Sequence, residues 1–341
     1  MSKKVSVIGG GSWGTALASQ LANNNHQILI YVRDNKLRND INNKHINTQY
    51  FPDIELSSSI TATTDLKEAV KYGEYIVMAV PTDATRKVMS QIEDYLKPQQ
   101  TIISTAKGIE EGSHLRNSQI INEYTTNPVV VLSGPTHAEE VIKELPSAAV
   151  IAANERSTAE NCQDLFMSST FRIYTNPDIT GVEMGGAVKN IIAMAAGIAD
   201  GLGYGDNTMA ALITRGLTEM SRLGSYMDSK LLTFAGLSGM GDLVVTCASN
   251  HSRNRRFGIN IGKGMSFDEA KEKVGQAVEG IKTTRAIYQW MKEENFDFEL
   301  PITNQIYHVL FENKDPLQAV DDLMLRGPKN EMEEVVEDTN W

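Results

Sequence analysis

The chain has 341 residues, enough for two domains, and its 41% hydrophobic and 22% charged residues are typical of a protein that buries substantial cores. Its formal net charge of -11 argues against a nucleic-acid partner, which would need a basic face, so an anionic ligand must be attracted by a local basic cluster. The two cysteines exclude a disulfide framework and favour a reducing, cytoplasmic compartment, and the scattered histidines predict no metal site.

The first half of the chain alternates short apolar runs with helix-like segments. Apolar runs without polar alternation fit strands that are covered on both faces. Such runs occupy residues 5–8, 28–32, 75–79, 101–105, 129–132 and 148–153. Helix-like segments occupy residues 15–24 and 66–71 and follow Pro81. Strands that alternate with helices predict βαβ units, so residues 1–178 are expected to form an α/β domain around a parallel sheet.

The second half changes character after about Asn176, where β-branched runs become rare. Helices are predicted at residues 182–199, 209–226, 267–274, 281–293 and 302–311. We therefore expect an all-α C-terminal domain over residues 179–341. No apolar run is expected to span a bilayer, which takes about 18 residues or more. The acidic end, residues 331–341, is expected to be a mobile tail.

Three glycines at residues 9–14 fit the pattern G-x-G-x-x-G between a predicted strand and a predicted helix. Gly9 is expected to make the tight turn, Gly11 to let a pyrophosphate approach the backbone, and Gly14 to let the helix pack closely. The helix N-terminus would then direct free N–H groups and a positive dipole end at the phosphates. This context favours a Rossmann-type, dinucleotide-binding domain over a merely structural glycine turn.

The end of the second predicted strand leaves the choice of cofactor open. An acidic residue about 20 positions after the glycine loop would hold the ribose 2′-hydroxyl of NAD, whereas an arginine would pair with the 2′-phosphate of NADP. Arg33 and Asp34 offer both. The sequence therefore predicts NADP or NAD, with Arg33 as a point in favour of NADP.

Two lysines are candidates for the chemistry. Lys107 follows a predicted strand, at the sheet edge where ligands bind in open α/β folds, although a solvated loop lysine is an equal alternative. Lys189 lies in a helix with few charges, where it must be paired, reach solvent or lose its proton. Burial and a second cation would lower its pKa towards neutrality and suit it to general-base catalysis. The alternative is a lysine that simply pairs with a carboxylate such as Glu183.

A basic cluster at residues 252–256, Ser-Arg-Asn-Arg-Arg, stands out in this acidic chain. An arginine fork flanked by hydroxyl and amide donors suits phosphate recognition. The alternative is a solvated helix end with ordinary surface ion pairs. A glycine-rich turn at residues 236–242 lies just upstream, and we expect Asp242 and Thr246 to direct polar groups towards the same site.

Seven motifs follow one another along nearly the whole chain, to about Arg326. They are Gly-Gly-Gly-Ser-Trp-Gly at 9–14, Ala-Lys-Gly-Ile-Glu at 106–110, Leu-Ser-Gly-Pro-Thr-His-Ala-Glu at 132–139, Glu-Met-Gly-Gly-Ala-Val-Lys-Asn at 183–190, Gly-Met-Gly-Asp-Leu at 239–243, His-Ser-Arg-Asn at 251–254 and Val-Glu-Gly at 278–280. This ordered set resembles the bacterial NAD(P)-dependent glycerol-3-phosphate dehydrogenases. The resemblance implies a Rossmann-type domain, a helical domain and an active site between them.

The resemblance also implies roles for individual residues, matched motif by motif. In this family the lysine that corresponds to Lys189 is the proton acceptor, and Lys107 touches both cofactor and substrate. The implied cofactor-binding residues are Gly9, Gly11, Ser12, Trp13, Gly14, Arg33, Asp34, Lys107, Ala138, Arg253 and Glu279. The implied substrate-binding residues are Lys107, Gly134, Thr136, Lys189, Asp242, Ser252, Arg253 and Asn254.

The expected reaction is the interconversion of glycerol 3-phosphate and dihydroxyacetone phosphate, which supplies phospholipid synthesis, in a possible homodimer. Lys189 would take the C2 hydroxyl proton, Lys107 would stabilise charge on that oxygen, and Arg253 would anchor the phosphate. One alternative is a related β-hydroxyacid or 2-ketopantoate-type dehydrogenase, whose substrates carry a carboxylate instead. Another is a dinucleotide-sensing regulator that keeps the fold and has lost the chemistry.

Overall fold

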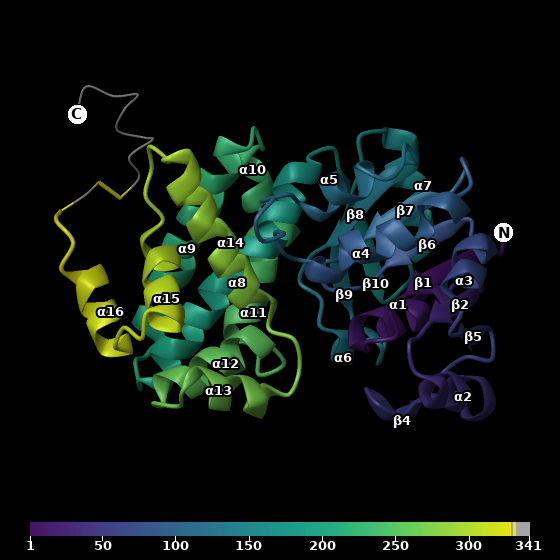
Figure 1. Cartoon of the computed structure of the whole chain (residues 1–341), viewed down its shortest axis with the longest axis horizontal. Helices are drawn as coiled ribbons and strands as arrows, with labels where there is room; N and C mark the ends of the chain where they lie inside the picture. The colour runs from purple at the N-terminus through teal and green to yellow at the C-terminus, as the bar shows by residue number, and fades with distance from the viewer. Residues whose placement is uncertain (329, 332–341) are drawn as a thin grey trace.

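The computed structural model describes residues 1–328, 330 and 331, so all of the predicted acidic tail except Glu331 lies outside the described residues. A mixed sheet with flanking helices forms one end of the molecule and a group of helices forms the other (Figure 1). The predicted fold class, a Rossmann-type α/β part followed by an all-α part, is confirmed.

The sheet has the strand order β10-β9-β8-β7-β6-β1-β2-β5. Its central strands are apolar runs that are buried on both faces, as expected for strands covered by helices on each side. The strands are β1 (Lys4–Ile8), β2 (Gln27–Tyr31), β5 (Ile60–Thr63), β6 (Tyr75–Met78), β7 (Thr101–Ser104), β8 (Val129–Ser133), β9 (Ser147–Ala152) and β10 (Phe171–Asn176). A separate hairpin pairs β3 (Ile46–Asn47) with β4 (Phe51–Glu55).

The expectation of a purely parallel sheet is wrong at one position. Strands β8 and β9 pair antiparallel, with Leu132 opposite Ile151, whereas the other pairs in this sheet are parallel. The connection between them contains one four-residue helix, α6 (Ala138–Val141), which is too short to return the chain along the face of the sheet. The segment between Gly134 and α6 therefore follows the end of β8.

Helices cover the sheet and connect its strands. They are α1 (Ser12–Asn23), α2 (Asn35–Lys44), α3 (Leu66–Tyr72), α4 (Thr82–Ile92) with the 3-10 turn η1 (Glu93–Tyr95), α5 (Asn117–Asn122), α6 and α7 (Arg156–Phe166). Side-chain caps begin two of them. Asp34 accepts a hydrogen bond from Leu37 N (2.8 Å) at α2, and Asp65 accepts one from Lys67 N (2.9 Å) at α3.

The helical part is built around α8 (Ile179–Gly201), which is buried along nearly its whole length. The other elements are α9 (Asp206–Tyr226), α10 (Leu231–Phe234), the π-helical turn η2 (Leu237–Gly241), α11 (Asp242–Ala248), α12 (Arg253–Gly262), α13 (Phe267–Val274), α14 (Glu279–Glu294), α15 (Pro301–Phe311) and α16 (Pro316–Met324). Figure 1 shows α8 running through this group with α11, α12 and α14 near it.

Glycines let α8 and α12 approach so closely that side chains are excluded from the contact. A Cβ atom on Gly197 would lie 2.1 Å from the carbonyl oxygen of Arg255, and one on Gly258 would lie 2.2 Å from that of Met194. The contact fixes the rotation of α12 about its axis relative to α8. It thereby decides which side chains of the basic cluster face Lys189 and which face away.

The prediction that no segment is long and apolar enough to span a bilayer is wrong by length and composition. Helix α8 and the helical stretch Leu231–Ala248 both pass that test. The apolar window of α8 is, however, completely buried inside the protein, as in the core helix of a globular fold. One or two such helices are weak evidence for a membrane.

Candidate active site

The glycine loop joins β1 to α1 with the geometry predicted for it. Gly9 has φ +121°, and a Cβ there would lie 2.5 Å from Ala79 O, while one on Gly14 would lie 1.9 Å from Gly9 O. A Cβ on Gly11 would meet no atom within 4 Å. The loop is therefore closed behind Gly9 and Gly14 and open at Gly11, which leaves the backbone there accessible to a phosphate.

Two further features of this loop fit a dinucleotide. Helix α1 begins after Gly11 without a side-chain cap, so its first N–H groups are free to bind an anion. The indole nitrogen Nε1 of Trp13 is buried and has no hydrogen-bond partner among the described residues. A buried donor without a partner is costly, and a bound cofactor would supply the acceptor.

Arg33 and Asp34 differ in how far their side chains are already engaged. Asp34 is the N-cap of α2 and accepts the Leu37 N–H, which is a structural role that the sequence analysis did not assign to it. Arg33 is exposed and forms no ion pair with any described residue. Of the two, only the Arg33 guanidinium is wholly available to a ligand.

Glu279 begins α14 and lies against the α/β part of the chain. A Cβ on Gly108 would sit 3.2 Å from Glu279 Oε2 and 2.6 Å from Thr82 Oγ1. Burial raises the pKa of Glu279 to about 7, although the positive charge of Arg253 acts in the opposite direction. Ala138, the other cofactor residue predicted away from the loop, is buried at the start of α6.

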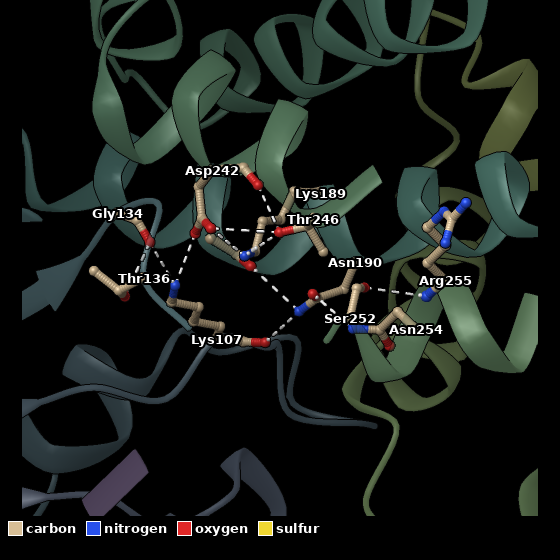
Figure 2. A network of polar contacts seen from close by, with 11 residues as sticks. Lys107, Gly134, Thr136, Lys189, Asn190, Asp242, Thr246, Ser252, Asn254 and Arg255 are labelled. Atoms are coloured by element: carbon tan, nitrogen blue, oxygen red, sulfur yellow. Dashed lines mark hydrogen bonds and ion pairs between the residues drawn. The ribbon is translucent and has the colours of Figure 1, made fainter. Parts of the chain in front are cut away.

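The two predicted lysines meet at one buried carboxylate, as Figure 2 shows. Lys189 Nζ, on α8, bonds to Asp242 Oδ1 and donates to Thr246 Oγ1 at 2.8 Å. Lys107 Nζ, which follows β7, donates to Asp242 Oδ2 at 2.8 Å and to Gly134 O at 2.9 Å. The side chains of Lys189 and Asp242 are 6% and 1% exposed, so this amine and this carboxylate are held out of water, whereas the Lys107 side chain is 17% exposed.

The surroundings lower the pKa of Lys189 to about 7. Burial is the largest cause, because it penalises the charged ammonium form. The nearby Lys107 lowers the pKa further, whereas the Asp242 carboxylate raises it. Lys189 can therefore carry or release a proton near neutrality, which is the property expected of a general acid or base at this position.

Glu183, the alternative partner considered for Lys189, is engaged elsewhere. Its carboxylate accepts hydrogen bonds from Arg116 Nη1 (2.6 Å), Ser118 N (2.8 Å) and Ser118 Oγ (2.6 Å). These contacts join α8 to the start of α5 in the α/β part. The carboxylate partner of Lys189 is therefore Asp242 and not Glu183.

A chain of amides, which the sequence analysis missed, connects the lysines to the basic cluster. Asn190 Nδ2 donates to Lys107 O (3.1 Å), and Asn190 Oδ1 accepts from Asn254 Nδ2 (2.8 Å). Asn254 Oδ1 then accepts from Gly280 N (3.0 Å) at the start of α14. A buried amide next to Lys189 in an apolar helix was the available signal, since such a group requires partners.

The basic cluster does not act as one unit. Ser252 caps α12 by accepting from Arg255 N (3.2 Å). Arg255 turns away from the lysines (Figure 2). Its guanidinium donates to Asp200 Oδ2 (2.6 Å) and Asn250 Oδ1 (2.8 Å). Arg253 forms no ion pair with the described residues, and its charge acts on Glu279. The prediction that these arginines bind a phosphate together is thus corrected. Arg255 forms a structural ion pair with Asp200, and Arg253 stays available to an anion.

Gly134 and Thr136 lie beside Lys107, after β8. Gly134 has φ +143°, and a Cβ there would lie 2.9 Å from Ala149 Cα, so only glycine fits. Its carbonyl accepts from both Lys107 Nζ and Thr136 Oγ1 (3.2 Å). The strand β8 thereby brings this loop to the lysines on the side opposite Ser252 and Asn254 in the view of Figure 2.

Comparison with known proteins identifies the family of the chain. Family models described as the N-terminus and the C-terminus of NAD-dependent glycerol-3-phosphate dehydrogenase match residues 4–159 and 178–321. The chain belongs to the NAD-dependent glycerol-3-phosphate dehydrogenase family. This confirms the family that the seven motifs predicted, and with it an oxidoreductase that acts on a CH–OH group with NAD or NADP.

Members of this dehydrogenase family match the chain over nearly all of its length. The chain is 64% identical to glycerol-3-phosphate dehydrogenase [NAD(P)+] of Halothermothrix orenii, covering 100% of both chains. It is 51% identical to the protein of the same name from Clostridium botulinum, covering 96% of this chain and 99% of that one. The crystal structure of glycerol-3-phosphate dehydrogenase from Coxiella burnetii superposes with a TM-score of 0.91 at 37% identity, covering 95% and 99% of the two chains.

Proposed function

We propose that this chain interconverts glycerol 3-phosphate and dihydroxyacetone phosphate with NADP or NAD, using Lys189 as the proton acceptor and donor. The observation that carries the proposal is the buried group formed by Lys189, Asp242 and Lys107. This group places an amine with a pKa of about 7 beside a second amine. The family to which the chain belongs is described by the same activity.

The residues present fit the cofactor. Gly9, Gly11 and Gly14 leave an open backbone cradle, and Ser12 and Trp13 begin the helix that would meet the pyrophosphate. The further residues proposed to hold the dinucleotide are Arg33, Asp34, Lys107, Ala138, Arg253 and Glu279. When bound, the dinucleotide would supply the hydride chemistry at C2 of the substrate in both directions.

Lys189 supplies the proton chemistry in this proposal. In the neutral form, its amine takes the proton from the C2 hydroxyl of the alcohol. In the ammonium form, it returns that proton to the oxygen during ketone reduction. The positive charge of Lys107 stabilises negative charge on the same oxygen. Asp242 accepts from both amines, which fixes the directions of their remaining N–H groups and lone pair.

The phosphate end of the substrate is assigned to Arg253 with Ser252 and Asn254, and the loop at Gly134 and Thr136 is assigned to the rest of the substrate. Asn254 already uses one N–H on Asn190 and its carbonyl oxygen on Gly280, so its second N–H is the group left for the phosphate. Binding energy from this remote end would hold C2 in place for transfer.

We further propose that residues 1–178 form the dinucleotide-binding domain and residues 179–341 the substrate-binding domain. The free, buried cysteines Cys162 and Cys247 support a reducing, cytoplasmic location. The proposed partners are small molecules and not nucleic acid. We propose no membrane span for this chain, and a homodimer stays a prediction. Reduction of dihydroxyacetone phosphate would supply glycerol 3-phosphate for phospholipid synthesis.

The test is the nicotinamide absorbance of NADPH or NADH mixed with purified protein and dihydroxyacetone phosphate. We expect oxidation of the nucleotide that depends on the phosphorylated ketone. Faster turnover with 2-ketopantoate would favour the carboxylate-substrate alternative. Nucleotide binding without turnover of either ketone would favour the sensing regulator.

A further inference from the structure

The loop that follows β8 carries a histidine to which the proposed mechanism gives no role. His137 comes directly after Thr136 and is the N-cap of α6, but its side chain makes no capping hydrogen bond. Its ring lies 5.7 Å from the ring of His251, centroid to centroid, at an angle of 51°. Since His251 precedes Ser252 at the start of α12, the two rings meet from the α/β part and the helical part of the chain.

The ring nitrogen Nε2 of His137 is buried and has no hydrogen-bond partner within the described part of the chain. Buried polar atoms normally have partners, and an unpaired one destabilises the fold. The only ring contact of His137 within the described part of the chain is the one with His251. Such an atom is suited to a ligand that arrives after folding.

The charges around His137 indicate what kind of ligand it suits. Burial is the main cause that lowers the pKa of His137, and Lys189 and Lys107 lower it further, while Glu139 and Asp242 act in the opposite direction. These surroundings favour the neutral form of the ring. A neutral imidazole matches an uncharged hydroxyl, whereas a phosphate is better matched by a guanidinium such as that of Arg253.

The position of the loop agrees with this chemistry. Lys107 and Lys189 lie between Gly134 and Thr136 on one side and Ser252 and Asn254 on the other (Figure 2). With the phosphate at Arg253 and C2 at the lysines, the third carbon of the substrate extends towards the loop of Gly134 and Thr136. That carbon carries the free hydroxyl.

We propose that His137 is a specificity-determining residue that hydrogen-bonds the free terminal hydroxyl of the three-carbon phosphate substrate through Nε2. The inference rests on the proposed function, because it takes the placement of C2 and of the phosphate from it. It adds a recognition contact to those proposed for Arg253 and Lys189.

The test compares dihydroxyacetone phosphate with hydroxyacetone phosphate, which has a methyl group in place of the terminal hydroxymethyl group and therefore lacks the free hydroxyl. We expect the unmodified protein to prefer dihydroxyacetone phosphate by about tenfold or more in kcat/KM, since a site built for a hydroxyl rejects an analogue that lacks it. His137→Phe, which keeps an aromatic ring against His251, should reduce this preference to about threefold or less. NADPH affinity, measured by fluorescence titration, should be unchanged.

His251→Phe is the matched control, because it changes the other ring of the same contact and should retain the preference. His137→Gln restores a hydrogen-bonding group and should recover most of the preference that His137→Phe loses. If His137→Phe fails to bind NADPH, the comparison of His137→Leu with His137→Gln replaces it, and the preference must again follow the polar side chain.

Full retention of the preference in His137→Phe, or in His137→Leu where that variant replaces it, would overturn the inference. A protein that binds NADPH and reduces neither ketone would contradict the proposed function instead. The two failures are distinguishable because the inference is judged on a ratio of two substrates, which exists only when turnover is observed.

Discussion

At the scale of single residues, Lys189 is the sharpest test of the chemistry. Lys189→Met keeps an unbranched side chain in the buried position and leaves Asp242 its ion pair with Lys107. We expect kcat to fall by about 10²–10⁴-fold, the usual contribution of a general acid or base. The affinity for NADPH should stay within about twofold, and Lys143→Met, at an exposed lysine, should leave turnover unchanged.

The same residue predicts how the rate depends on pH. Because burial lowers the pKa of Lys189 to about 7, alcohol oxidation, which needs the neutral amine, should rise through pH 7 and level off above it. Ketone reduction, which needs the ammonium form, should fall over the same interval. Profiles of kcat/KM for both directions check this, and two profiles that rise together would exclude Lys189 as the shared proton carrier.

Arg33 is expected to decide the preference between the two cofactors. It is exposed and unpaired among the described residues, whereas Asp34 already caps α2. Arg33→Ala should raise the KM for NADPH by about 10–100-fold, the loss expected for hydrogen bonds to a charged phosphate. The KM for NADH serves as the internal control and should change by about twofold at most. Equal losses with both nucleotides would place Arg33 outside the 2′-phosphate site.

Residue patterns identified the lysines and Asp242 but not the division of the basic cluster. Lys189 was found because a charge in an apolar helix requires an explanation. The role of Arg255 could not be predicted, because its direction depends on how α12 is rotated against α8. That rotation is set by glycine contacts between helices far apart in sequence, such as Gly197 against the Arg255 carbonyl. Asn190 needed the same information, since its partners Lys107 and Asn254 are distant in the chain.

At the scale of elements, apolar runs predicted the central strands and the long helices. They did not predict the direction of every strand or the strands at the edges of the sheet. The β8–β9 reversal was missed because periodicity locates strands without orienting them. Strand β10 was missed because it alternates buried and exposed residues at the sheet edge. Strand β5, with the sequence Ile-Thr-Ala-Thr, carries too little apolar character to stand out.

Helix α15 depends on a buried acid from another helix, which gives the fold a distinctive pH response. Glu219, on α9, accepts from Ile302 N, Thr303 N (3.1 Å) and Thr303 Oγ1 (2.9 Å), and so caps a helix whose own N-cap, Leu300, has no capping side chain. Burial raises the pKa of Glu219 to about 7. The folded protein thus binds this proton more tightly than the unfolded chain does.

The sign of the effect follows from linkage. A raised pKa contributes stability that is fully present below the unfolded value of 4.5 and is lost as the pH rises through 7. Between pH 5 and 8 the stability of the native protein relative to Glu219→Gln should therefore fall by about 1–3 kcal/mol. Urea denaturation at several pH values measures the difference. A constant difference would show that Glu219 does not titrate in this interval.

At the scale of the whole molecule, the two parts of the chain are joined at several polar contacts. Lys107 reaches Asp242, and the Arg116 pair with Glu183 connects the start of α5 to α8. His114 stacks on Trp290 with ring centroids 5.8 Å apart and pairs with Glu293. Since Lys107 and Lys189 come from different parts, these contacts set the distance between the two amines on which the proposed chemistry depends.

The Arg116–Glu183 contact is the most buried of the ion pairs that join the two parts without contributing an amine to the site. Their side chains are 12% and 3% exposed, and Glu183 also accepts from one of the free amides at the start of α5, that of Ser118. Glu183→Ala leaves Arg116 with a buried charge and Ser118 N without its acceptor, so we expect a loss of about 3–5 kcal/mol in the free energy of unfolding. The matched control is Glu160→Ala, which removes an exposed partner of Arg156 on α7 and should cost about 0–1 kcal/mol. Equal losses in the two variants, measured by urea denaturation, would mean that this contact does not hold the parts together.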